Sequence, residues 1–108
     1  MVQGQLKLTG KQKRFLRAHG NRLRPIFSIG KHGLNQAWLS EVVQAVDRRE
    51  LVKISLQQSA TVTTTEVAAY ITKHSQLTVV QELGRTLLLF CESSNPARRT
   101  ISHGVFQL

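Results

Sequence analysis

The sequence predicts a two-layer α/β domain, with an N-terminal helix followed by β-α-β-α-β-β, a four-stranded mixed sheet and helices on one face. Two amphipathic segments alternate with short apolar runs, which is the pattern of strand–helix–strand units. Right-handed crossovers make the first three strands mutually parallel. A Gly84-Arg85 turn interrupts the last apolar stretch and predicts a fourth strand antiparallel to the third.

The first helix is expected over Lys11–His19, after a loose end at residues 1–5. Thr9 is a suitable N-cap, and Gly20-Asn21 ends the helix. Four cations lie close together on this helix, and they are Lys11, Lys13, Arg14 and Arg17. Like charges at three- and four-residue spacings each destabilise a helix by a few tenths of a kcal/mol, roughly, so a neutralising partner is expected.

The segment Ile29–Asn35, with the sequence Ile-Gly-Lys-His-Gly-Leu-Asn, is the candidate binding loop. A strand is expected to begin at Pro25 and to end at Gly30. Because Gly30 and Gly33 lack a Cβ, the backbone can bend sharply and approach another molecule closely. A glycine turn before a helix N-terminus presents N–H groups and a positive dipole, and Lys31 adds a full charge. The loop is suited to an anion, although an isolated G-x-x-G more often only shapes a connection.

The remaining expected elements are a helix over 36–49, a strand over 51–56, a helix from the capping box at 63–66 to about His74, and strands over 77–83 and 86–91. Asn35 can cap the first of these helices. Trp38 is expected in the core, because it lies on the apolar stripe of that helix. The run over 86–91 is nearly all apolar, as expected of a central strand or one covered on both faces.

The 108 residues predict a single domain over 1–96 and a C-terminal tail over 97–108. No apolar run is long enough to span a bilayer, and the N-terminus lacks the pattern of a signal peptide. The one cysteine, Cys91, cannot form an internal disulfide. A cytoplasmic protein with no membrane partner is therefore expected.

The charge is large and unevenly distributed. Fifteen Lys and Arg residues against six Asp and Glu give a formal net charge of +9 and a pI near 10.9. Residues 1–33 contain no acid, and their bases are Lys7, Lys11, Lys13, Arg14, Arg17, Arg22, Arg24 and Lys31. A run of charge is often only a solvated face. A basic segment that leads into the glycine loop nevertheless favours a polyanionic partner.

No enzyme activity, metal or cofactor is expected. The four histidines are scattered, and neither an H-E-x-x-H motif nor a cysteine pair is present to bind zinc. The six acids are isolated in sequence. Cys91 lies in the expected apolar strand over 86–91 and is expected to be a buried small hydrophobe and not a nucleophile. Gly33 is not followed by the Lys-Ser/Thr of a Walker A motif.

Four sequence blocks resemble the CRM domain, the family of the small bacterial YhbY-type proteins and of plant organellar splicing factors. The blocks lie at 16–25, 29–34, 51–54 and 83–90, so that the resemblance covers roughly residues 6–92. It implies an RNA-binding domain akin in fold to the C-terminal domain of a translation initiation factor. It also implies a GxxG loop like that of KH domains, and an association of bacterial members with precursors of the large ribosomal subunit.

In this resemblance, the family loop corresponds to residues 30–33 and the basic helix to residues 11–17. His32 replaces what is often a smaller polar residue, and the tail from Arg98 has no counterpart. His32 is explained equally well as a ligand contact and as a plain exposed loop residue. The candidate RNA-binding residues are Lys11, Lys13, Arg14, Arg17, Arg24, Gly30, Lys31, His32, Gly33, Asn35 and Arg85.

Two hypotheses on function remain. The first is a monomeric RNA-binding protein that acts on ribosomal RNA, in precursors of the large subunit. The second is a ribosome-docking or protein-interaction domain whose basic face meets an acidic protein. A DNA-binding role is weaker, because no helix-turn-helix signature prepares a helix to contact base edges. Nuclease-sensitive RNA that copurifies with the protein would discriminate between the two hypotheses.

Overall fold

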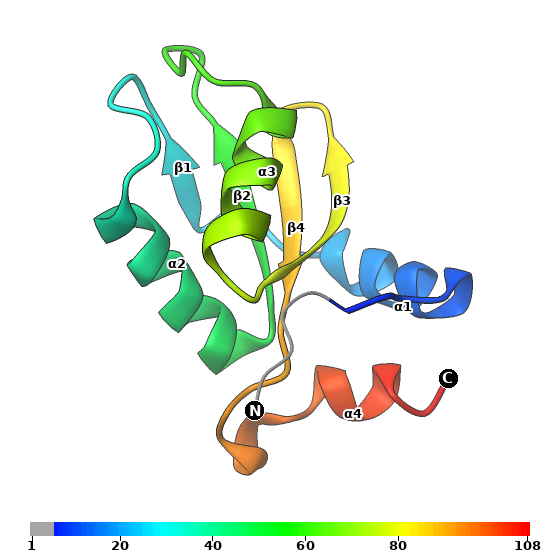
Figure 1. Ribbon diagram of the computed structural model, residues 1–108. Coiled ribbons are helices and arrows are strands. Elements are labelled where there is room, and N and C mark those ends of the chain that lie inside the picture. Colours follow the sequence, from blue (N-terminus) through cyan, green and yellow to red (C-terminus); the bar gives the residue numbers. More distant parts are fainter. Residues whose placement is uncertain (1–5) are drawn as a thin grey trace.

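The computed structural model describes residues 6–108, in which a four-stranded sheet is covered by helices (Figure 1). The expectation for residues 1–5 lies outside the described residues. The strands are β1 (Phe27–Ile29), β2 (Leu51–Leu56), β3 (Thr78–Leu83) and β4 (Thr86–Phe90), in the spatial order β1-β2-β4-β3. β1 is parallel to β2, and β4 is antiparallel to both β2 and β3. The predicted mixed sheet, with its first three strands mutually parallel, is therefore confirmed.

Helices lie on both faces of this sheet. The two helices of the crossovers, α2 (Gln36–Arg49) and α3 (Thr64–His74), cover one face, as predicted (Figure 1). The opposite face is partly covered by α1 (Gly10–Gly20) and α4 (Ile101–Val105), and a short 3-10 turn, η1 (Pro96–Arg98), precedes α4. The structure thus adds an incomplete third layer to the two layers that the sequence predicts.

β4 separates two hydrophobic clusters because its side chains alternate between the two faces of the sheet. Leu87 and Leu89 belong to the larger cluster with the α2 and α3 residues. Leu88 and Phe90 belong to the smaller cluster, together with Leu16 of α1 and others. These four residues are at most 2% exposed, which confirms that the apolar run over 87–90 is a strand covered on both faces.

The element boundaries follow the capping signals closely. α2, β2 and α3 have the expected bounds, and the side chains of Asn35 and Thr63 cap the two helices. The expectation that β1 starts at Pro25 was wrong, because the strand begins at Phe27. Proline has no N–H to donate to a sheet ladder. α1 is held by a capping box, which sequence reasoning missed, between Thr9 and Gln12.

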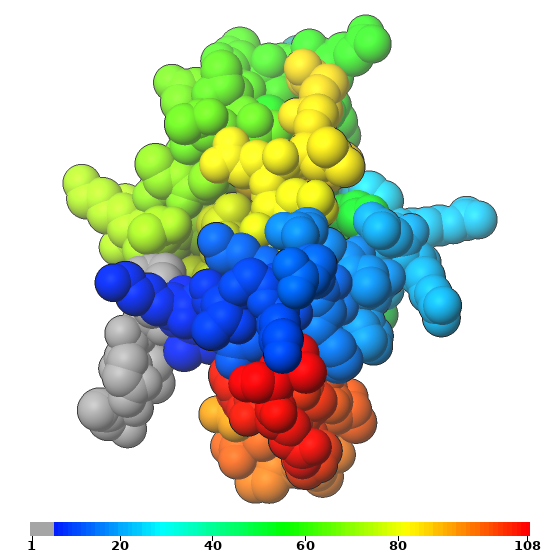
Figure 2. Space-filling model, turned by 90° about the vertical axis from the view of Figure 1, so that its right-hand side faces the viewer, coloured from blue at the N-terminus to red at the C-terminus, as the bar shows by residue number. Residues whose placement is uncertain are grey.

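The segment after residue 96, expected as a tail, packs against the rest of the protein. Val105 of α4 is fully buried, and its carbonyl accepts a hydrogen bond from Gln12 Nε2 of α1 at 3.4 Å. In Figure 2 this C-terminal segment (red) lies directly beneath α1 (blue). α4 thus closes the end of the smaller hydrophobic cluster.

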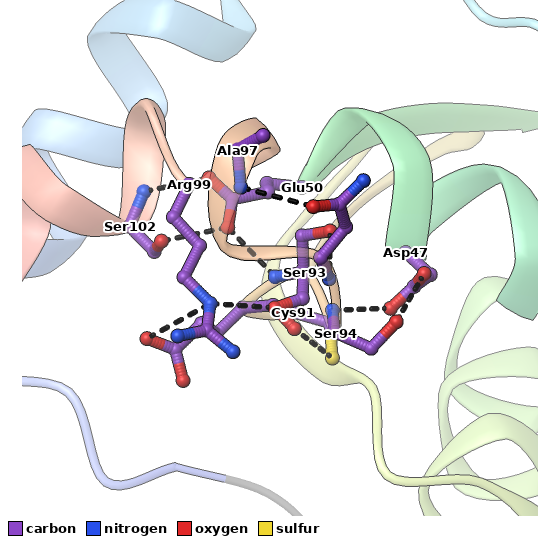
Figure 3. Close-up of polar contacts among 10 residues, drawn as sticks. Asp47, Glu50, Cys91, Ser93, Ser94, Ala97, Arg99 and Ser102 are labelled. Atoms are coloured by element: carbon purple, nitrogen blue, oxygen red, sulfur yellow. Dashed lines mark hydrogen bonds and ion pairs between the residues drawn. The ribbon is translucent and has the colours of Figure 1, made fainter.

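A buried acid anchors this segment (Figure 3). Glu50 ends α2, is 0% exposed and has a left-handed φ of 67°. Its carboxylate accepts hydrogen bonds from the Ser93 N–H at 2.7 Å, the Ser102 N–H at 2.9 Å and the Ser102 hydroxyl at 2.6 Å. A non-glycine residue with positive φ is uncommon. The three hydrogen bonds therefore tie the end of α2 to the segment after β4 and to α4.

Candidate nucleic-acid interface

The loop from Gly30 to Gly33 joins β1 to α2 and is a tight turn, closed by a hydrogen bond from the Gly33 N–H to the Gly30 carbonyl at 3.1 Å. The two glycines are needed for different reasons. Gly33 has a φ of +71°, and a Cβ added there would meet nothing within 4 Å. A Cβ added to Gly30 would lie 2.7 Å from Gln57 Oε1. Gly33 therefore sets the backbone conformation and leaves the space beside the turn open, whereas Gly30 lets Gln57 pack closely.

Gln57 braces the loop from the segment after β2. Its backbone N–H donates to the Ile29 carbonyl at 2.9 Å, and its side-chain Nε2 donates to Ser28 Oγ at 2.9 Å. Trp38 of α2 also contributes, because its indole Nε1 donates to the Ser28 carbonyl at 3.2 Å. Trp38 is half-buried and packs against the margin of the core, so the expectation of a core residue holds only in part. Sequence reasoning missed Gln57 and Ser28, because no local pattern signals a contact across 29 positions.

Arg85 lies at the same end of the sheet as the glycine loop, but its guanidinium donates hydrogen bonds to backbone carbonyls of the protein. Its Nε donates to the Leu56 carbonyl at 3.2 Å, and its Nη2 donates to the Gln57 carbonyl. Arg85 thus positions the segment that braces the glycine loop. Arg85 is nevertheless exposed, so its positive charge remains at this end of the sheet.

The other loop residues fall into two groups. Lys31 and His32 are exposed, and no hydrogen bond or ion pair of their side chains occurs among residues 6–108. Asn35 is already used as the N-cap, since its Oδ1 accepts from the Trp38 N–H at 2.8 Å. The first-turn N–H groups of Gln36 and Ala37 have no partner within the helix, and they point out of its N-terminus beside the glycine turn.

The basic helix α1 presents its cations to solvent. Lys11, Lys13 and Arg14 are exposed and Arg17 is half-buried, while Leu16 between them is fully buried. Within the described residues, the one ion pair joins Arg99 and Glu92, with 3.8 Å between Nε and Oε2. None of the α1 cations therefore has an acidic partner in residues 6–108.

The structure separates the loop from most of the basic helix. Figure 1 shows the loop at the upper left, above α2, and α1 at the lower right beyond the sheet. The exposed Arg22 and Arg24 lie in the segment that links α1 to β1. Positive charge is therefore also present between the basic helix and the strand that leads into the glycine loop. The candidate residues therefore form two basic regions joined by a basic connection, and not one compact pocket.

The single cysteine and the acids around it form the other polar group that the sequence analysis considered. Cys91 was expected to be buried in the last strand, but β4 ends at Phe90 and Cys91 is only half-buried. Burial raises the pKa of the Cys91 thiol, and the nearby Asp47, Glu50 and Glu92 raise it further. In the part of the chain that the structure describes, no three His, Cys, Asp or Glu residues are grouped to hold a metal ion. None of the helices over 6–108 is long and apolar enough to cross a membrane.

Comparisons with known proteins agree with this architecture. The chain is 42% identical over 86 residues to "Probable RNA-binding protein YqeI" of Bacillus subtilis, which covers 80% of this chain and 90% of that protein. It is 29% identical over 83 residues to an "RNA-binding protein" of Haemophilus influenzae, covering 77% and 84% of the two chains. The solution structure of the hypothetical protein SAV1595 from Staphylococcus aureus has a TM-score of 0.68 and 32% identity, covering 83% of this chain and 94% of that one.

The family assignment follows from the extent of the match. The family described as the CRS1 / YhbY (CRM) domain matches residues 8–90. These residues include α1, the glycine loop and all four strands, so that both basic regions fall within the match. The chain belongs to the CRS1/YhbY (CRM) domain family.

Proposed function

We propose that this protein binds RNA, and that its target is ribosomal RNA in precursors of the large ribosomal subunit. The observation that carries the proposal is the group of α1 cations that meet no acid among residues 6–108, in a chain whose relatives are named RNA-binding proteins. A net charge of +9 opposes compaction of so small a domain unless a polyanion neutralises it. The protein acts as a cytoplasmic monomer in this proposal.

The glycine loop binds one phosphate group. Gly33 leaves open space on the outer side of the turn, so a phosphate can approach the backbone closely. The N–H groups of Gln36 and Ala37 donate to it, and the dipole of α2 favours its negative charge. Lys31 adds a charge–charge contact, and His32 contacts the adjoining nucleotide.

The cations of α1 and of the following segment bind further phosphates along the same strand. These contacts fix the position of the RNA without reading its bases. No aromatic pair resembling that of an RRM is present in the sequence, so contacts to phosphate, ribose and shape dominate recognition.

Two measurements test the proposal. RNA that copurifies with the protein should give a high 260/280 nm absorbance ratio that nuclease removes. With roughly four to six phosphate contacts, the affinity for large-subunit ribosomal RNA should fall with salt with a log–log slope of about −3 to −4. A slope near zero would contradict the phosphate contacts. Tight binding to an acidic protein, with no binding to RNA, would favour the docking alternative.

A further inference from the structure

We propose that the part of the sheet left uncovered beside α1 is a second contact surface for the same RNA, where riboses and unpaired bases of a single-stranded segment bind. The inference rests on the proposed function and extends its site beyond phosphate contacts. We call this surface the open sheet face, and its residues are Ile26, Ser28, Lys53, Ser55, Leu83 and Thr86.

Strand register places these side chains on one face. Ser28 pairs with Ser55, Ser55 with Thr86, and Thr86 with Leu83, so the four form one row across all four strands. Leu88, which pairs with Lys53, points into the α1 cluster, and residues two apart on a strand share a face. The row therefore lies on the face that carries α1, and away from α2 and α3.

α1 covers only part of that face. A Cβ added to Gly20, the last residue of α1, would lie 2.6 Å from Leu88 Cδ2, so the helix end rests directly on Leu88. The next row toward the glycine loop consists of Ser28, Ser55, Thr86 and Leu83, and none of these four residues is fully buried. There Ser28 is exposed, Ser55 and Thr86 are half-buried, and Leu83 is 61% exposed.

β2 shows the difference between the two faces within one central strand. Val52, Ile54 and Leu56 face α2 and α3 and are at most 6% exposed. Lys53 and Ser55 face the other way and are half-buried. Central strands that are covered on both faces are apolar throughout. A lysine and a serine at these two positions keep the middle of the sheet polar and accessible.

The chemistry of the open sheet face suits a nucleotide. The Lys53 ammonium and the Ser55 hydroxyl have no protein partner in residues 6–108. A hydroxyl both donates and accepts, as do the ribose 2′-OH and the base edges of RNA. Leu83 and Ile26, which is 44% exposed, offer apolar contact for unstacked bases at opposite sides of the face.

Charge favours RNA over a neutral or acidic peptide as the occupant. Arg22 and Arg24 lie between α1 and β1, and Lys31 follows β1, so cations flank both ends of the edge strand that borders the face. In Figure 2, side chains of this light-blue segment after α1 project beyond the body of the protein. An RNA strand held by its phosphates at both ends of β1 would present its riboses and bases to Lys53 and Ser55 on the neighbouring strand β2.

A matched pair of charge variants tests the inference. Ser55→Glu places a carboxylate in the centre of the open sheet face, and Ser40→Glu places one on the exposed side of α2. Both change the net charge equally, so general electrostatic effects cancel. With a single-stranded RNA of about 20 nucleotides as the probe, we expect Ser55→Glu to bind at least about 10-fold more weakly than Ser40→Glu. Equal affinities would overturn the inference.

A second pair guards against a folding defect in Ser55→Glu. Lys53→Met removes the ammonium and keeps an apolar stem over the sheet, and Lys73→Met makes the same change on α3. Of these two variants, we expect only Lys53→Met to weaken RNA binding, by about 3- to 5-fold, with its thermal midpoint unchanged. If the wild type binds no RNA, the proposed function fails as well. If the loop and α1 variants lose binding while Ser55→Glu and Lys53→Met match their controls, only the open sheet face is wrong.

Discussion

The acids near the end of α2 and the cations of α1 differ in how their charges are compensated. Asp47 accepts from the Ser94 N–H at 2.8 Å and from the Ser94 hydroxyl at 2.9 Å, and Glu50 accepts the three hydrogen bonds described above (Figure 3). Glu92 forms the ion pair with Arg99. The cations of α1, in contrast, meet no acid in the described residues, although Lys13 and Arg17 lie one helical turn apart.

This difference separates two uses of charge. Buried or hydrogen-bonded acids that hold chain segments together contribute to folding, and removing their acceptors leaves buried donors unsatisfied. Exposed cations spaced so that they repel one another do not stabilise the fold in this way. The interactions between exposed charges are weak in water. Changes at the acidic end should therefore alter stability with little effect on RNA binding, and changes at the basic regions should do the reverse.

The largest effect is expected at Glu50. In Glu50→Gln, the amide NH₂ replaces one acceptor oxygen and faces N–H or O–H donors of Ser93 or Ser102. We expect the free energy of unfolding, measured by urea denaturation, to fall by about 2–4 kcal/mol. Glu41→Gln, on the exposed side of α2, is the control and should change it by less than about 0.5 kcal/mol. RNA affinity of the folded variant should stay within about 2-fold of wild type, and a large loss would contradict the separation.

The glycine loop should show the opposite pattern. Gly30→Asp combined with Gly33→Asp puts two carboxylates where a phosphate is proposed to bind, and we expect at least about 100-fold weaker RNA binding. An aspartate at position 33, where φ is positive, should lower the stability of the fold by about 1 kcal/mol. At position 30 the Gln57 side chain can move away from the new Cβ.

The double alanine variant at the same positions is the control for that strain. It adds Cβ atoms without charge, so it should lose stability to a similar degree and much less affinity. Wild-type affinity in the double aspartate variant would show that the loop is only a connector between β1 and α2.

A smaller loss is expected for α1. Lys11, Arg14 and Arg17 changed together to Gln remove three phosphate contacts, which should make the salt slope shallower by about 2 and weaken binding about 30-fold. The loss should be similar for RNAs of different sequence, because these contacts do not involve bases. The control variant changes Arg48, Arg49 and Lys73 to Gln, with the same change in net charge on α2 and α3. Equal losses in both variants would mean that only net charge matters.

Local sequence signals predicted most of the fold. Asn35 and Thr63 fixed the starts of two helices, because capping depends on residues within three positions. The place of α4 could not be predicted, since it depends on Glu50, which contacts Ser102 across 52 positions. The same limit applies to the site. The glycines and cations were visible as a local pattern, whereas the bracing by Gln57 and the open sheet face depend on strand register.

The smallest effect concerns Cys91, which lies among the acids and tests their electrostatic influence. Burial, reinforced by Asp47, Glu50 and Glu92, raises the pKa of its thiol above the usual value of 9.0. Because the thiolate is the reactive form, native protein at pH 8 should alkylate more slowly than urea-unfolded protein. A folded pKa above the unfolded one also means that stability falls slightly as the pH rises past about 9. Equal rates of alkylation in native and unfolded protein would show that neither burial nor the acids affect the thiol, and alkylated protein should still bind RNA because Cys91 lies apart from both basic regions.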